Sequence, residues 1–153
     1  MTGASRGIGA ATAVALDRAG ARVALSGRDE AALKIVADEL CNDPVVLVAD
    51  LSHPSAPTAL AEAALEQLGG LEILVNNAAI AVRRPSEELN AEQIDEMLAV
   101  NLRAPLLLIA ALLLTMRGAR NGSIINLTTL DLYGAAVCGR AALPALQHRS
   151  EWW

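Results

Sequence analysis

Short apolar runs alternate with helix-forming segments along most of this 153-residue chain, and no other feature constrains its fold as strongly. The expected strands are Arg22–Ser26, Val45–Val48, Leu71–Val75 and Ser123–Leu127. The expected helices are Ala10–Ala19, Asp29–Leu40, Ser55–Leu68 and Asn90–Met116. Continuously apolar strands separated by helices are typical of a parallel sheet covered on both faces. We therefore predict an α/β fold with a doubly wound parallel sheet.

Composition and charge limit the classes of protein to which this chain can belong. Hydrophobic residues make up 54% of the chain and charged residues 19%, which predicts one globular domain. The net charge of -5 and the lack of a basic tract argue against nucleic-acid and anionic-membrane partners. The apolar run Leu106–Leu114 is much shorter than the roughly 20 residues of a membrane helix, so we expect a buried helix. Cys41 and Cys138 lie far apart and no secretion signal is visible, which favours a cytoplasmic location.

A glycine-rich segment, Thr2-Gly3-Ala4-Ser5-Arg6-Gly7-Ile8-Gly9, comes directly before the first expected helix. Glycine at such a turn lets the backbone approach a pyrophosphate, whose negative charge is stabilised by the free N–H groups of the helix N-terminus. The segment therefore predicts a nucleotide site. A tight turn without a ligand is the alternative.

The spacing G-x-x-x-G-x-G resembles the turn of the short-chain dehydrogenase/reductase family. Two further segments, Asp50-Leu51 and Asn76-Asn77-Ala78-Ala79, follow expected strands in the order that this family shows. The resemblance implies that Asp50 and Leu51 hold the adenine, and that Asn77 and Ala78 line the ribose, with Ala79 in place of the family's final glycine. Taken alone, these segments could be a helix cap and an Asx turn. The expected cofactor-binding residues are Gly3, Ser5, Arg6, Gly7, Ile8, Gly9, Arg28, Asp50, Leu51, Asn77, Ala78 and Ala79.

The cofactor preference depends on the residues after the first expected strand, Ser26-Gly27-Arg28. A 2′-phosphate needs cations, whereas a free ribose is usually held by an acidic side chain. No acid stands at the strand tip, and Arg28 together with Arg6 resembles the NADP-preferring members of the family. Asp29 is expected to cap the next helix. NADP(H) is therefore favoured, with NAD(H) as the alternative.

The resemblance implies hydride transfer between the nicotinamide and a carbonyl or alcohol substrate, with a tyrosine, a lysine, a serine and an asparagine as catalytic residues. Asn101 matches the asparagine. Because Pro105 has no N–H, we expect the Asn101 carbonyl to lack its helical donor, although a helix kink without function is the alternative. Thr129 matches the serine, although two threonines can also simply end a strand.

The tyrosine and the lysine do not fit the family pattern. Its Y-x-x-x-K is matched by Ala136 and Arg140, and Tyr133 lies seven positions before Arg140 instead of four. Lys34 is the only lysine and belongs to the second expected helix. An arginine does not readily release a proton, so we do not expect ordinary tyrosine-dependent catalysis from this chain.

The two ends also depart from the family. Its members begin with an apolar strand in the middle of the sheet and continue well beyond this length. We therefore predict an incomplete Rossmann-like domain over residues 1–129, a divergent tail over 130–153, and truncation at both ends.

Three hypotheses follow for the function. The first is that the chain represents an active NADP-dependent oxidoreductase whose sequence is cut short. The second is that it is an inactive fragment that binds a nucleotide or another protein. The third is a product that cannot hold its sheet, because the lost central strand leaves backbone groups unpaired. The family forms homo-oligomers, which we do not expect of this chain.

Overall fold

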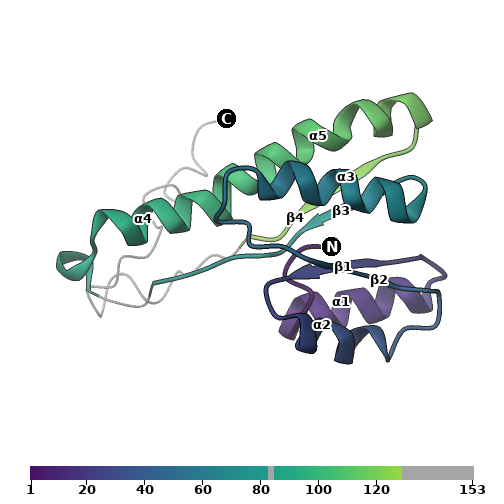
Figure 1. The fold of residues 1–153 in the computed structure, drawn as a ribbon, viewed down its shortest axis with the longest axis horizontal. Coiled ribbons are helices and arrows are strands. Elements are labelled where there is room, and N and C mark those ends of the chain that lie inside the picture. Colours follow the sequence, from purple (N-terminus) through teal and green to yellow (C-terminus); the bar gives the residue numbers. More distant parts are fainter. Residues whose placement is uncertain (83–84, 129–153) are drawn as a thin grey trace, which may run out of the picture.

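Two short parallel sheets form the centre of the computed structural model, which describes residues 1–82 and 85–128 (Figure 1). Strand β1 (Ala24–Gly27) pairs with β2 (Val45–Val48), and β3 (Ile73–Asn76) pairs with β4 (Ser123–Asn126). The predicted parallel α/β architecture is confirmed. The sheet of the described residues is also incomplete, as predicted, because β1 and β3 are not paired with each other.

Met1 and Thr2 lie between the two sheets and connect them. Thr2 forms a parallel bridge with Ser26 of β1, whose N–H donates to the Met1 carbonyl at 2.9 Å. On the other side, the Thr2 N–H donates to the carbonyl of Val75 in β3 at 3.0 Å. These two residues therefore take the place that a full strand would occupy between β1 and β3.

The helices occupy the expected segments with shifted ends. They are α1 (Gly7–Arg18), α2 (Glu30–Ala37), α3 (Ala56–Leu68), α4 (Ala91–Leu98) and α5 (Ala104–Ala119), with a π-helix, η2 (Ala99–Arg103), and a short 3-10 helix, η1 (Ser86–Glu88). Helix α1 begins three residues earlier than predicted because the glycine turn leads straight into it. Strands β1 and β3 begin two residues later than predicted, at the points where their ladders with β2 and β4 begin. Pro44, which lacks an N–H, stands directly before β2.

Local capping explains where several helices begin and end. The Asp29 carboxylate accepts the Ala32 N–H at 3.0 Å, so the predicted cap of α2 is confirmed. Asn90 and Gln93 form a reciprocal capping box at the start of α4. Gly69 ends α3 in the left-handed conformation at φ 77°.

The helices form a layer on each side of β1 and β2 (Figure 1). Helices α1 and α2 cover one face, where Leu25 and Leu33 are fully buried. Helices α3 and α5 cover the other face and also pack over β3, with Leu108 and Leu112 as their most buried large side chains. The carboxyl ends of β1, β2 and β3 remain open between these layers.

The segment from Ala91 to Ala119 is helical throughout, and by length and composition alone it could cross a membrane. The predicted apolar run, Leu106–Leu114, is one part of this longer helical segment. Ala104, Leu108, Leu112 and Met116 are nevertheless buried in the cluster that contains α3. Its opposite side carries exposed apolar side chains, namely Ile94, Leu98, Leu102, Leu106 and Leu114.

A buried carboxylate that sequence reasoning missed fixes α1 to the loop before β2. Asp17 accepts the N–H groups of Cys41 and Asn42 at 3.0 and 2.9 Å. It also accepts the Asn42 side-chain amide at 3.0 Å. The Cys41 N–H is the main reason that the pKa of Asp17 is lowered from its ordinary value.

Candidate nucleotide-binding site

A cavity of about 620 Å³ opens at the carboxyl ends of β1, β2 and β3. This is the edge at which doubly wound α/β proteins bind their ligands. The cavity wall contains all twelve predicted cofactor-binding residues: Gly3, Ser5, Arg6, Gly7, Ile8, Gly9, Arg28, Asp50, Leu51, Asn77, Ala78 and Ala79. It also contains residues that were not predicted, namely Ser26, Gly27, Asp29, Ala32, Ala49, Ile80 and Val100. The fold therefore gathers five separate parts of the sequence around one hollow, within residues 3–9, 26–32, 49–51 and 77–80 and at Val100.

The glycine turn is held in place by Asn77. Its side-chain amide donates to the carbonyls of Thr2 and Gly3 at 3.0 and 2.9 Å. In return, the Thr2 hydroxyl accepts the backbone N–H groups of Asn77 and Ala78, both at 3.0 Å. The Asx turn proposed as the alternative is thus not the contact that Asn77 makes. Asn77 instead fixes the turn to the end of β3.

Gly3 and Gly9 are required by this close packing. A Cβ on Gly3 would lie 2.8 Å from the Cα of Ala78. A Cβ on Gly9 would overlap the Gly3 carbonyl oxygen and lie 2.6 Å from the Asn77 amide nitrogen. Either side chain would therefore push the turn away from β3.

Gly7 has a different role, because a Cβ there would meet nothing within 4 Å. Its φ of 57° is the left-handed conformation that glycine adopts most readily. Gly7 begins α1, whose first turn contains no acidic residue and whose N-cap, Arg6, makes no side-chain capping bond. The N–H groups of this turn are thus available to an anion such as a pyrophosphate. The open space and the N–H groups fit the diphosphate of a dinucleotide.

Arg28 and Asp50 are charged residues that line the cavity at the ends of β1 and β2. The Arg28 side chain is 60% exposed, and its guanidinium lies 4.0 Å from the Glu96 carboxylate of α4. Asp50 accepts the Ser52 N–H at 3.0 Å, and this bond is the main reason that the pKa of Asp50 is lowered. Asp50 therefore makes the local turn contact that was considered as the alternative, and it still lines the cavity. Leu51 beside it is buried.

Asn101 lies next to the cavity without lining it. Its side chain accepts the Ile80 N–H at 2.9 Å and donates to the Ile80 carbonyl at 2.8 Å, and Ile80 belongs to the cavity wall. Asn101 stands in the π-helix η2, where the Ala104 N–H donates to the carbonyl of Ala99, five residues earlier. The disturbance expected from Pro105 thus takes the form of a π-turn and not of a broken helix.

The remaining predicted catalytic positions cannot be placed. Thr129, Tyr133, Ala136 and Arg140 all lie outside the described residues. Within residues 1–82 and 85–128, no cluster of histidine, cysteine or acidic side chains is arranged to hold a metal ion. The described part of the site is therefore a nucleotide cradle with Asn101 beside it.

Comparison with known proteins identifies the family of the chain. The family model for short chain dehydrogenases matches residues 1–136. An uncharacterized oxidoreductase of Staphylococcus saprophyticus is 35% identical over 135 residues, which are 86% of this chain and 58% of the relative. A similar oxidoreductase of Staphylococcus epidermidis is 32% identical over 160 residues, covering 99% of this chain and 68% of the relative. The chain thus spans between about half and two thirds of the length of these relatives.

Solved structures agree with the sequence comparison. A metagenomic short-chain oxidoreductase in complex with NADP is 40% identical, with a TM-score of 0.78 over 84% of this chain and 60% of that one. A 3-oxoacyl (acyl-carrier-protein) reductase of Agrobacterium tumefaciens C58 with NADP bound is 32% identical, with a TM-score of 0.77 over 84% of this chain and 51% of that one. The shared fold covers 84% of this chain in both comparisons. This chain belongs to the short-chain dehydrogenase family and has its Rossmann-like fold.

Proposed function

We propose that this chain binds NADP(H) in the cavity at the glycine turn. We further propose that the protein is an oxidoreductase that transfers hydride between this cofactor and a carbonyl or alcohol substrate. The single observation that carries the proposal is the meeting of the glycine turn, Arg28 and Asn77 around one cavity of about 620 Å³. When bound, the nicotinamide would supply the hydride chemistry.

Each part of the cavity has a task in this proposal. The first turn of α1 and the open space at Gly7 receive the diphosphate. Asp50 and Leu51 lie where the adenine would be held, and Asn77 with Ala78 would face the ribose. Asn101 keeps the backbone of Ile80, a residue of the cavity wall, in place.

The preference for NADP(H) is supported by charge. Arg6 and Arg28 both line the cavity and are both exposed, so their guanidinium groups can meet a 2′-phosphate from solvent. Asp29, the first acid after β1, is engaged as the cap of α2. Two solved relatives carry NADP, which also favours this cofactor.

A second candidate is nucleotide binding without turnover. The sequence favours it because alanine and arginine stand at the positions of the family's tyrosine and lysine. Under this alternative, the cradle would bind NADP(H) while no group in the chain performs the proton transfer.

Titration with NADPH and with NADH, followed by the fluorescence of the reduced nicotinamide, tests the proposal. We expect NADPH to bind at least about tenfold more tightly than NADH. Oxidation of NADPH with a panel of aldehydes and ketones then separates the two candidates. Binding with turnover supports the oxidoreductase, whereas binding without turnover supports the second candidate. A folded chain, judged by circular dichroism, that binds neither nucleotide would overturn both.

A further inference from the structure

The π-helix η2 supplies side chains to two separate segments at the nucleotide cavity. Asn101 of η2 holds the backbone of Ile80, which follows β3. Two residues later, the Arg103 guanidinium donates to the carbonyl of Ser52, which follows β2. Val100, directly before Asn101, is buried and lines the cavity itself. The position of η2 therefore affects the segment after β2 as well as the segment after β3.

The turn after β2, residues 50–53, is the part that Arg103 holds. Within this turn the Ser52 N–H donates to the Asp50 carboxylate at 3.0 Å, and the His53 N–H donates to the Asp50 carbonyl at 3.2 Å. Within residues 1–82 and 85–128, Arg103 is the only residue remote in sequence that forms a hydrogen bond with this turn. Its bond to the Ser52 carbonyl therefore anchors a turn whose other hydrogen bonds are local.

Apolar packing alone does not set the direction of the Asp50 carboxylate. Leu51 is buried in the cluster that contains α3 and α5, and this burial fixes the depth of the turn. The Asp50 side chain is only half-buried, and its partner in the turn is the Ser52 N–H. Because this N–H and the carbonyl that Arg103 binds belong to the same residue, holding the carbonyl also limits the movement of the N–H. The direction of the carboxylate thus depends on Arg103.

The Arg103 side chain is kept in this place at a cost. It is half-buried, and its Nε is buried without a hydrogen-bond partner among the residues that the structure describes. An arginine turned toward solvent would have all its N–H groups hydrated, so the bond to the Ser52 carbonyl must outweigh this loss. A hydrogen bond from a charged donor is strong enough to do so. The contact with Ser52 is therefore a specific anchor.

We propose that Arg103 is a positioning residue for the adenine end of the nucleotide, an inference that rests on the proposed NADP(H) site. Through Ser52, it aims the Asp50 carboxylate at the adenine amino group, which is a hydrogen-bond donor. Arg103 does not itself line the cavity, so it acts only through the turn. Together with Asn101, it also fixes the distance between the Asp50 and Ile80 parts of the cavity wall.

A comparison of NADPH with its hypoxanthine analogue, which lacks the adenine amino group, tests this proposal by nicotinamide fluorescence. Arg103→Met keeps an apolar stem and loses the donor, so we expect the affinity for NADPH to fall about tenfold. The affinity for the analogue should fall less than about twofold, because it has no amino group for Asp50 to bind. Equal losses for both nucleotides would indicate a general structural effect and would overturn the proposal.

Two matched variants make the test specific. Arg103→Lys keeps the charge and a donor for this single bond, so we expect its NADPH affinity to stay within about threefold of the original. A loss as large as in Arg103→Met would overturn the anchoring bond. Arg117→Met removes an exposed arginine in the last turn of α5 and should affect neither nucleotide. If Arg103→Met is not folded by circular dichroism, Arg103→Gln takes its place, because it keeps a polar end on a shorter side chain.

The pKa of the Asp50 carboxyl, measured by NMR without nucleotide, tests the anchor independently of the proposed function. The Ser52 N–H is the main reason that this pKa is lowered from 3.8, so Arg103→Met should raise it toward that value. High salt during the titration screens the direct effect of the lost charge. An unchanged pKa would overturn the proposal even if NADPH binds. If the pKa rises but the original chain does not bind NADPH, the proposed function is wrong and the adenine role with it, while the anchor is confirmed.

Discussion

Thr2 and Asn77 each bind the backbone of the other, although 75 positions separate them in the sequence. The Thr2 hydroxyl accepts the Asn77 N–H, and the Asn77 amide donates to the Thr2 carbonyl, both at 3.0 Å. This reciprocal pair fixes the glycine turn to the end of β3. The shape of the cavity therefore depends on it.

Thr2→Val keeps the shape of the side chain and removes the hydroxyl. The N–H groups of Asn77 and Ala78 then lose their acceptor in a buried place, so we expect a loss of about 1–3 kcal/mol in the free energy of unfolding. Urea unfolding measures this loss. Thr58→Val, at an exposed position of α3, is the matched control and should change stability little. Equal losses in both variants would contradict the role given to Thr2.

Gly9→Ala tests the close packing of the turn. Its Cβ would overlap the Gly3 carbonyl, so the turn must move and NADPH affinity should fall at least about tenfold. Nicotinamide fluorescence measures the affinity. Gly118→Ala is the matched control, because a Cβ there meets nothing within 4 Å in the last turn of α5. That variant should keep the affinity and change stability by less than about 1 kcal/mol. Unchanged affinity in Gly9→Ala would show that NADPH binds elsewhere.

Arg28→Ala tests the origin of the cofactor preference. We expect the affinity for NADPH to fall about tenfold while the affinity for NADH stays the same, because only NADPH carries the 2′-phosphate. Arg18→Ala removes an equally exposed arginine at the far end of α1 and should affect neither nucleotide. A parallel decrease for both nucleotides in Arg28→Ala would place this side chain at the diphosphate instead.

Asp17→Asn should lower the Tm at neutral pH and reduce the acid sensitivity of the protein. The pKa of Asp17 is lowered in the folded state, mainly by the Cys41 N–H, so its contribution to stability is present above the ordinary value of 3.8. That contribution is lost as the pH falls through the folded pKa. Thermal unfolding between pH 3 and 7 measures the effect. Asp38→Asn, at an exposed position, should leave the pH profile unchanged.

The amino terminus should make stability rise with pH between 6 and 8. Burial lowers the pKa of the Met1 amino group from 8.0 to about 6, so in this interval the unfolded chain binds a proton that the folded chain does not. Two pKa units correspond to about 3 kcal/mol, gained as the pH increases from 6 to 8. Urea unfolding of the protein and of its N-terminally acetylated form measures the difference. Identical pH slopes for the two forms would show that the amino group is not buried.

Much of the fold could be predicted from the sequence because it depends on local pattern. The caps at Asp29 and Asn90 bind groups three residues away, so a short window contains all that is needed. The glycine turn is equally local, and its position before α1 predicted the cavity. The strands were found because each contains or directly follows a short apolar run.

Other features depend on partners that are remote in sequence. The contact of Asp17 with Cys41 joins residues 24 positions apart, and in the sequence Asp17 looks like an ordinary polar residue of α1. The division into two sheets was expected from the family resemblance and not from the apolar runs, because such runs alone do not reveal which strands are neighbours. The contacts of the Thr2 hydroxyl also could not be predicted, because its partners, the N–H groups of Asn77 and Ala78, follow β3 and are remote in the sequence.

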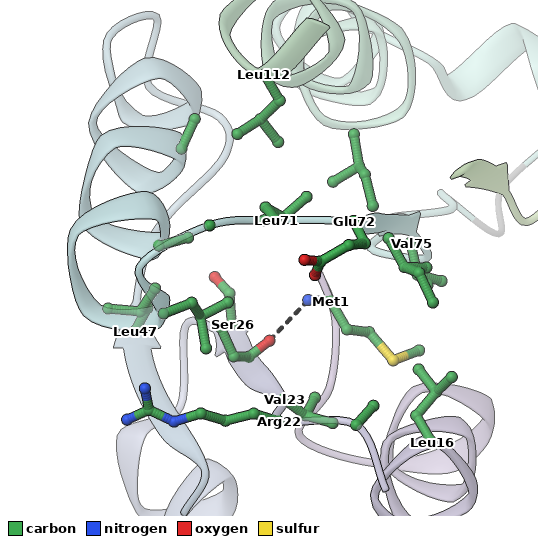
Figure 2. A pocket seen from close by; sticks show the side chains of 18 of the residues that line it. Met1, Leu16, Arg22, Val23, Ser26, Leu47, Leu71, Glu72, Val75 and Leu112 are labelled. Carbon is green, nitrogen blue, oxygen red and sulfur yellow. Dashed lines mark hydrogen bonds between the residues drawn. The ribbon is translucent and has the colours of Figure 1, made fainter. Parts of the chain in front are cut away.

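Of the two hydrophobic clusters, only one contains strand residues from both sheets. The cluster under α1 and α2 draws its strand residues only from β1 and β2, such as Leu25 and Val46. The cluster under α3 and α5 includes Ala24 and Leu47 from one sheet and Leu74 from the other. Apolar packing therefore joins the sheets on one side only. A change in the spacing of β1 and β3 would therefore be a rotation of one sheet against the other about the α3–α5 layer. Such a rotation would strain the backbone bonds by which Met1 and Thr2 join Ser26 to Val75 (Figure 2).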